Sequence, residues 1–202
     1  MNIISNCCAG GEFYKRVYKT QYTNPFIWSM MTAEDFIAFL KNYGKINYKK
    51  YKIKPVKDED YFALEIDGKF DIVYTHYHYK DVEKTVHNVD VYYRDIKKYI
   101  VEKYLDRTNR MLSSNEAPEF FIISYTKYLY NYTYDKMLEI IDLINKHGFK
   151  CTIITQYYSL LEKSNDKIKI IHDPNVAKES ENFPLFLIRD NARKLGLAKL
   201  SF

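Results

Sequence analysis

The sequence predicts a single α/β domain over residues 1–202, with a mostly parallel sheet, helices on both of its faces and an antiparallel hairpin insertion at residues 45–75. Three segments rich in apolar residues are typical of strands that are buried on both faces: 119–125, 150–155 and 167–172. An amphipathic segment at 134–147 separates the first two runs, and strands that alternate with helices favour parallel pairing. A chain of 202 residues also fits within one domain.

Two N-terminal segments are expected to extend this frame. Residues 1–5 have the pattern of a short buried strand that joins the sheet, and a helix can start within residues 12–17. The next helix is predicted at residues 33–43, because Thr32 is a favourable N-cap and Asp35 follows three positions later, as in a capping box.

The insertion at residues 45–75 is predicted from its turn and its charge. Asp67-Gly68, between two strand-like segments, is a strong hairpin signal. Residues 45–57 are rich in lysine with tyrosines interleaved. Such a run is typical of a solvated loop or edge strand, and less often of a nucleic-acid interface.

The composition excludes several broad classes of protein. Hydrophobic residues make up 47% of the chain and charged residues 28%, which fits neither a disordered chain nor a membrane protein. The net charge of +5 is dispersed along the chain, so we do not expect nucleic acid as a partner. Three cysteines, no visible signal peptide and no apolar run of membrane-spanning length predict a cytoplasmic protein without a membrane span. The sequence does not define the oligomeric state.

The segment Asn6-Cys7-Cys8-Ala9-Gly10-Gly11 is the strongest candidate for chemistry. It follows the first predicted strand and precedes a helix, so it should lie at the carboxyl edge of the sheet, where open α/β sheets bind ligands. A helix N-terminus lowers the pKa of a nearby thiol and favours a nucleophilic thiolate. Gly10 and Gly11 would let backbone N–H groups approach an oxyanion or a phosphate. The alternative interpretation is that the cysteines are small buried residues and the glycines form a tight turn.

A nucleophilic thiol needs a base, and His76 and His78 are the first candidates. Both follow the end of a predicted strand, and alternation would put them on the same face if that strand continues. His172 ends the last predicted strand and could face the same edge. The spacing of cysteines and histidines matches no common metal-binding motif, so we expect no metal.

The segment at residues 81–111 is helical in its pattern, with a break expected near Asn88 or Arg107. It carries Arg94, Arg107 and Arg110. Arginines on such a helix are usually exposed and solvated, but they can also bind an anion through charge-assisted hydrogen bonds.

The opening Ile-Ser-Asn-Cys-Cys-Ala-Gly-Gly at residues 4–11 is followed in order by further patterned segments: 24–26, 33–42, 71–72 and 78–80, with Arg107 and Arg110 before the next strand. Together they resemble a bacterial family of unknown function that is associated with exopolysaccharide biosynthesis, whose opening is Ile-Ser-Asn-Asn-Cys-x-Gly-Gly. That alignment matches the family's cysteine to Cys8. The opening is also similar to that of a family of papain-like cysteine peptidases, which matches Cys7 instead.

The resemblance implies a carbohydrate-modifying protein, and we expect a cysteine-dependent O-acyltransferase or esterase that acts on a saccharide or glycan. Cys8, or alternatively Cys7, is the expected nucleophile, with His78 or His76 as base and Asn6 as an oxyanion donor. Further residues expected to contact substrate or donor are Gly10, Gly11, Phe26, Trp28, Tyr79, Arg107 and Arg110. No cofactor is certain, and coenzyme A or a nucleotide sugar could be the donor. A glycosyltransferase and a non-enzymatic glycan- or protein-binding module are the alternatives.

Overall fold

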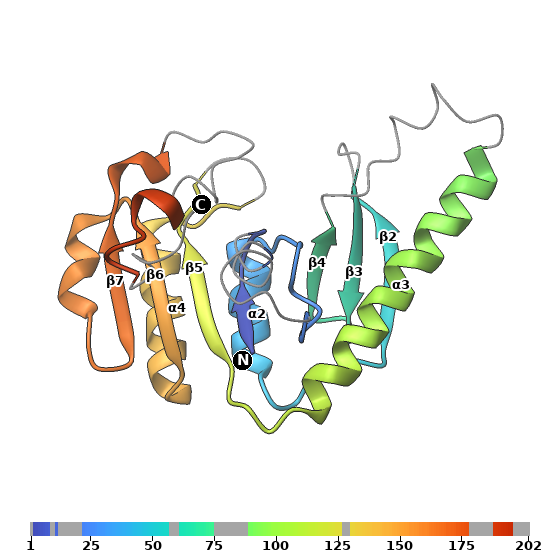
Figure 1. Ribbon diagram of the computed structural model, residues 1–202, viewed down its shortest axis with the longest axis horizontal. Coiled ribbons are helices and arrows are strands. Elements are labelled where there is room, and N and C mark those ends of the chain that lie inside the picture. The colour runs from blue at the N-terminus through green and yellow to red at the C-terminus, as the bar shows by residue number, and fades with distance from the viewer. Residues whose placement is uncertain are drawn as a thin grey trace.

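The strands of the protein form two sheets, one parallel and one antiparallel (Figure 1). The computed structural model describes residues 2–8, 11, 22–56, 61–74, 89–126, 130–177 and 188–195. The parallel sheet has the order β1-β5-β6-β7, with β1 at Ile3–Ser5, β5 at Glu119–Ile123, β6 at Lys150–Thr155 and β7 at Ile168–His172. The antiparallel sheet has the order β2-β3-β4, with β2 at Tyr51–Pro55, β3 at Phe62–Ile66 and β4 at Phe70–Tyr74. The predicted α/β class is confirmed, and the insertion is a separate three-stranded sheet.

Helices α2 (Ala33–Asn42) and α4 (Tyr134–His147) cover one face of the parallel sheet (Figure 1). Their apolar stripes share a core with side chains from the sheet such as Phe120 and Ile153. Thr32 caps α2 as predicted, since its hydroxyl oxygen accepts a 3.0 Å hydrogen bond from the Asp35 N–H. The predicted helix start within residues 12–17 lies outside the described residues.

The opposite face of the parallel sheet is covered, within the described part of the chain, by short irregular segments. Its core contains strand residues such as Phe121 and Ile171, together with Ile27 from the loop before α2. Val176 from the turn η4 (Pro174–Ala177) and Ile188 complete this core. Within the described residues, the cover on this face is therefore made of turns.

The antiparallel sheet packs against the long helix α3 (Val89–Ser113) (Figure 1). The Tyr104 hydroxyl of α3 donates a 2.7 Å hydrogen bond to the Tyr48 carbonyl before β2. Asp67 and Gly68 between β3 and β4 have φ angles of 55° and 67°, which is the left-handed backbone of the predicted tight hairpin turn. Helix α3 runs without interruption through Arg107, so of the two positions expected for a break Arg107 is wrong, and Asn88 lies outside the described residues. Among the described residues, no helix is both long and apolar enough to cross a membrane.

A two-residue bridge joins the two sheets. Met30 forms an antiparallel bridge with Val73 of β4 through hydrogen bonds of 2.8 and 2.9 Å. The N–H of the next residue, Met31, donates a 3.0 Å bond to the carbonyl of Asn6, immediately after β1. The backbone of the antiparallel sheet is therefore connected directly to the segment that carries Cys7 and Cys8.

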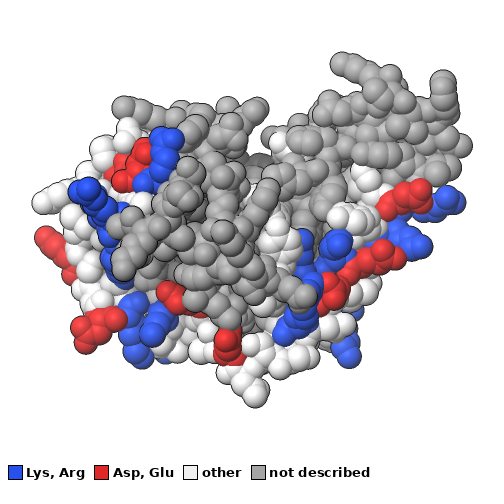
Figure 2. Space-filling view, in the orientation of Figure 1, with Lys and Arg blue, Asp and Glu red and all other residues white. Residues whose placement is uncertain are grey.

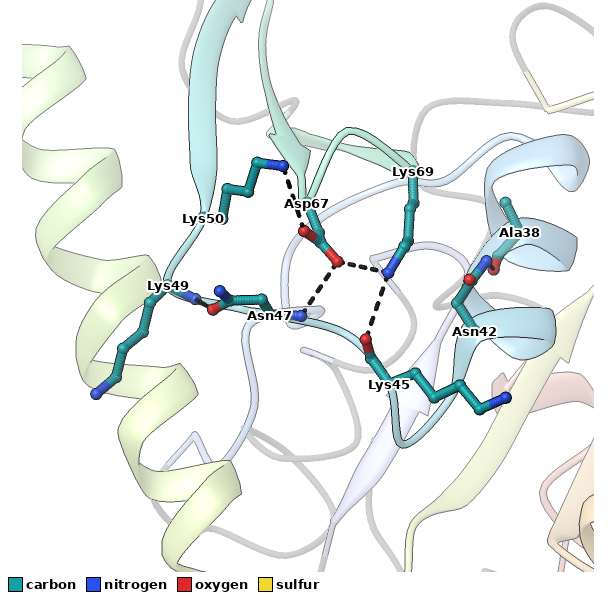
Figure 3. Close-up of polar contacts among 8 residues, drawn as sticks. All are labelled: Ala38, Asn42, Lys45, Asn47, Lys49, Lys50, Asp67 and Lys69. Carbon is teal, nitrogen blue, oxygen red and sulfur yellow. Dashed lines mark hydrogen bonds and ion pairs between the residues drawn. The ribbon is translucent and has the colours of Figure 1, made fainter.

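The lysine-rich segment forms the edge strand β2 and the loop before it. A loop or edge strand was the first of the two interpretations of this segment. Asp67 gathers this region: it lies 2.5 Å from the Lys69 ammonium, 3.3 Å from the Asn47 N–H and 3.7 Å from the Lys50 ammonium (Figure 3). The hydrogen bond with Lys69 and that with the Asn47 backbone lower the pKa of Asp67. Acidic side chains also lie among the basic ones on the face in Figure 2. The contacts of Asp67 with Lys50 and Asn47 therefore connect the loop before β2 to the β3–β4 turn.

Candidate active site at the carboxyl edge of the parallel sheet

All four strands of the parallel sheet end at one edge, and the residues that follow them form the candidate site. The segment 6–8 follows β1, Ser124 follows β5, Gln156 follows β6, and His172 ends β7. The Ser124 hydroxyl donates a 2.8 Å hydrogen bond to the Thr155 hydroxyl, which ties the ends of β5 and β6 together. Ligands of open α/β sheets bind beyond this edge.

The three cysteines differ in their access to solvent. Cys8 is partly exposed, whereas Cys7 and Cys151 are only 0% and 2% exposed. Burial raises the pKa of the Cys151 thiol well above its usual value, and the charge of Glu119 adds to this effect. Cys7 packs in the second core, with its sulfur 3.8 Å from the Ser5 hydroxyl. Of the two cysteines in the motif, Cys8 is the one that is exposed to solvent.

Asn6 continues the strand pairing beyond the end of β1. Its side-chain N–H donates to the Ile123 carbonyl at 2.9 Å, and its side-chain oxygen accepts from the Ile123 N–H at 3.0 Å. This amide pair copies the backbone ladder, and Asn6 is fully buried. The expected role as an oxyanion donor is therefore not retained. Asn6 instead fixes the point at which β1 ends and the cysteines begin.

Gly11 ends the turn that begins at Cys8, and it lies against the indole ring of Trp28. The Gly11 N–H donates a 2.9 Å hydrogen bond to the Cys8 carbonyl, so it already has a partner other than an oxyanion. A Cβ atom on Gly11 would lie 2.3 Å from two carbons of the Trp28 ring. Trp28 has a φ of 60°, which is rare for a bulky side chain. Trp28 is partly exposed beside the turn, whereas Gly10 lies outside the described residues.

The loop that carries Trp28 is fastened by residues that the sequence analysis expected at the substrate. Arg107 is only 7% exposed; its guanidinium donates a 2.7 Å hydrogen bond to the Ile27 carbonyl and lies 5.0 Å from the centre of the Tyr22 ring. The expectation of a solvent-exposed Arg107 is wrong, and we do not retain it as a phosphate ligand. Phe26 is fully buried, with its ring 4.8 Å from that of Phe39. Both residues hold the loop in place.

Arg110 lies in the last turn of α3 and forms an ion pair with Asp106, one turn earlier. The end of α3 leads into the start of β5, at the opposite end of the parallel sheet from Cys8 (Figure 1). An anion bound by Arg110 would therefore lie away from the carboxyl edge, and we do not retain this arginine in the candidate site.

The expected bases His76 and His78, and the neighbouring Tyr79, lie outside the described residues. The last described residue before them is Tyr74, at the end of β4. Because β4 is linked to the segment after β1 through Met30 and Met31, the chain leaves β4 about two strand spacings, or ~10 Å, from β1. A contact between Cys8 and the segment that carries His76 and His78 therefore stays a prediction.

His172 belongs to a different part of the same edge. Three steps across the sheet separate β1 from β7, a distance on the order of 14 Å. Because of this spacing between the strands, we do not retain His172 as the base of Cys8. Within the described ranges, no three His, Cys, Asp or Glu side chains gather as a metal site would require.

Two features escaped the sequence analysis. Tyr158 follows β6 and is 72% exposed beside His172; its position directly after a parallel strand was the signal that could have identified it. Asp58-Glu59-Asp60 is an Asp-x-Asp triplet, an arrangement that can hold a metal ion with a nucleotide phosphate. This triplet lies outside the described residues.

A family model described as a domain of unknown function (DUF1919) matches residues 1–115, more than half of the chain. The chain belongs to the DUF1919 family. The DUF1919 segment contains β1, α2, the antiparallel sheet and α3, and it includes Cys7 and Cys8. Strands β5 to β7 follow it, so Tyr158 and His172 lie beyond the matched segment. No curated protein and no solved structure gives a significant match.

Proposed function

We propose that this DUF1919 protein is a cysteine-dependent acyl-group enzyme, either an O-acyltransferase or an esterase, that acts on a saccharide through Cys8. One observation carries the proposal: Cys8 is a partly exposed thiol at the carboxyl edge of a parallel sheet, whereas Cys7 beside it is buried. The resemblance of residues 4–11 to a family associated with exopolysaccharide biosynthesis supports a saccharide as the substrate.

The proposed reaction has two steps. A base, for which His78 and His76 are the candidates, takes the proton of Cys8, and the thiolate attacks the acyl carbonyl of the donor. A thioester forms, and the donor's alcohol or thiol leaves with the proton from the base. A sugar hydroxyl then attacks the thioester and gives its proton, through the base, to the departing Cys8 sulfur. Water in place of the sugar hydroxyl makes the same site an esterase.

The covalent intermediate provides the test. We expect that incubation with p-nitrophenyl acetate or acetyl-coenzyme A leaves an acetyl group on Cys8, detectable by mass spectrometry of its peptide. Cys8→Ala should abolish this labelling, whereas Cys7→Ala should retain it because Cys7 is buried in the core. Labelling that depends on Cys7, or no acyl-enzyme with either donor, would contradict the proposal.

A non-enzymatic glycan-binding module is the second candidate, favoured by the exposed ring of Tyr158 at the same edge. A binding module has no need of a reactive thiol. Saccharide binding together with an unreactive Cys8 would support this second candidate over the first.

A further inference from the structure

We propose that Tyr158 and His172 form a subsite for one ring of an extended saccharide, at the corner of the carboxyl edge away from Cys8. Tyr158 is the first residue of the 3-10 helix η3 (Tyr158–Lys163), which two residues separate from the end of β6. His172 is the last residue of β7, the neighbouring strand. The inference rests on the proposed function for the class of substrate.

The exposure of Tyr158 sets it apart from the core tyrosines. Its side chain is 72% exposed, whereas Tyr132 and Tyr104 are fully buried. The His172 ring approaches Tyr158 edge-on, with ring centres 5.4 Å apart and planes at 84°. This is the T-shaped geometry that aromatic pairs favour, and it orients the tyrosine ring while leaving most of it open to solvent.

The backbone beneath Tyr158 is held in place before any ligand arrives. The N–H of Tyr157 donates a 3.1 Å hydrogen bond to the Thr155 hydroxyl, and its own hydroxyl donates to the Tyr132 carbonyl at 3.3 Å. Leu160, two residues after Tyr158, is fully buried and anchors η3 in the core. A ring on such a fixed segment loses little conformational entropy when it binds a ligand.

A sugar ring is the ligand that suits this surface. It presents a face of C–H groups, which can stack on the electron-rich face of an aromatic ring, and a rim of hydroxyl groups. The His172 ring and the partly exposed amide of Gln156 stand at the same strand ends and can both donate and accept hydrogen bonds. The subsite thus offers an apolar face together with groups that form hydrogen bonds.

The spacing across the sheet defines the length of the saccharide. Tyr158 follows β6, whose end is two strand steps from that of β1, and His172 ends β7, three steps away, so the subsite lies on the order of 10–14 Å from the end of β1, which is longer than a single sugar ring. A ring on Tyr158 and a hydroxyl at Cys8 must therefore belong to different sugar units. The substrate class that fits both positions is an oligosaccharide or polysaccharide.

Binding of defined hexasaccharides tests the subsite. We expect at least one of cellohexaose, maltohexaose and chitohexaose to bind the full chain by isothermal titration calorimetry. Tyr158→Ala should weaken that binding about tenfold, and Tyr158→Phe should stay near the wild type because the stacking ring is kept. Tyr99→Ala, which removes an exposed tyrosine from α3, is the matched control and should have no effect. Because the Tyr158 ring is mostly exposed, its removal should leave the fold intact.

Three results would overturn the subsite: no binding of any hexasaccharide, equal losses in Tyr158→Ala and Tyr99→Ala, or Tyr158-dependent binding of uridine monophosphate in place of the sugars. Cys8→Ala separates the subsite from the proposed function, because it should leave hexasaccharide binding unchanged. Tyr158-dependent binding without any acylation of Cys8 would refute the acyl chemistry and leave the subsite standing.

Discussion

The indole of Trp28 lies so close to Gly11 that no side chain fits at position 11 without movement. We therefore expect Gly11→Ala to lower the free energy of unfolding by about 1–3 kcal/mol, the usual cost of overpacking a well-packed site. The added methyl group would meet ring carbons at 2.3 Å, and the ring cannot move freely because Arg107 fixes the loop through Ile27. Urea unfolding measures the change.

A double-mutant cycle shows whether the indole ring is the cause. In the background of Trp28→Ala the same glycine substitution should cost much less, so the two substitutions should be non-additive by about 0.5–3 kcal/mol. Additive effects would mean that the turn after Cys8 does not depend on Trp28.

Asp35 is a second residue with a measurable signature. Burial raises its pKa above the ordinary value of 3.8, although hydrogen bonds from Thr32 and from the Asp71 backbone act in the opposite direction. The folded state thus binds a proton more tightly than the unfolded state, so ionisation of Asp35 lowers stability as the pH rises through its folded-state pKa. Asp35→Asn lacks this ionisation. As the pH rises from below 3.8 to neutral, the free energy of unfolding of this variant should therefore increase relative to that of the wild type. A difference between the two proteins that stays constant with pH in urea unfolding would contradict the raised pKa.

Single residues also differ in whether the sequence alone could predict their roles. The turn residues Asp67 and Gly68 could be predicted, because their conformation is determined by their neighbours in the chain. Asn6 could not, since its partner Ile123 is 117 positions away. The same holds for Arg107, whose acceptor Ile27 is 80 positions away. Only the folded chain shows that these polar groups serve backbone carbonyls.

At the scale of elements, the sequence periods predicted most of what is described. The apolar runs became β5, β6 and β7, and the amphipathic stretches became α2 and α4, because burial against a sheet imposes a local pattern on each of them. The individual side chains that cover the second sheet face, within the described residues, could not be predicted. Turns such as η4 contribute single buried residues there, and single residues carry no period.

A buried hydrogen bond joins helix α3 to the loop before α2. In the Arg107→Met variant, Met at this position keeps the unbranched shape of the side chain but has no N–H group, so the Ile27 carbonyl loses its 2.7 Å donor. We expect a loss of about 1–3 kcal/mol in the free energy of unfolding, the cost of an unsatisfied buried acceptor. Arg94→Met on the same helix is the matched control, because the Arg94 side chain is 74% exposed, and it should change stability by less than about 0.5 kcal/mol. Equal effects of the two substitutions in chemical denaturation would show that the buried hydrogen bond contributes nothing.

At the scale of the whole molecule, the DUF1919 segment and the strands that follow it contribute different parts of the carboxyl edge. The DUF1919 segment supplies Cys8 and the antiparallel sheet, whose strand β4 is linked through Met30 and Met31 to the end of β1. The strands that follow it supply β5 to β7 and, in our proposal, the aromatic subsite at Tyr158. A thiol at one end of the edge and an exposed ring at the other fit a long substrate better than a small one.

Alkylation of the native protein shows whether Cys8 is the reactive centre at this edge. With iodoacetamide and peptide mass spectrometry over time, we predict that Cys8 is modified first, by a factor of about ten or more over Cys7 and Cys151, whose reaction requires opening of the core. Cys8→Ala should leave the folded protein almost unmodified, and denaturant should make all remaining cysteines react alike. Modification of Cys7 or Cys151 at the rate of Cys8 in the native state, or a Cys8 that reacts only after unfolding, would contradict the account.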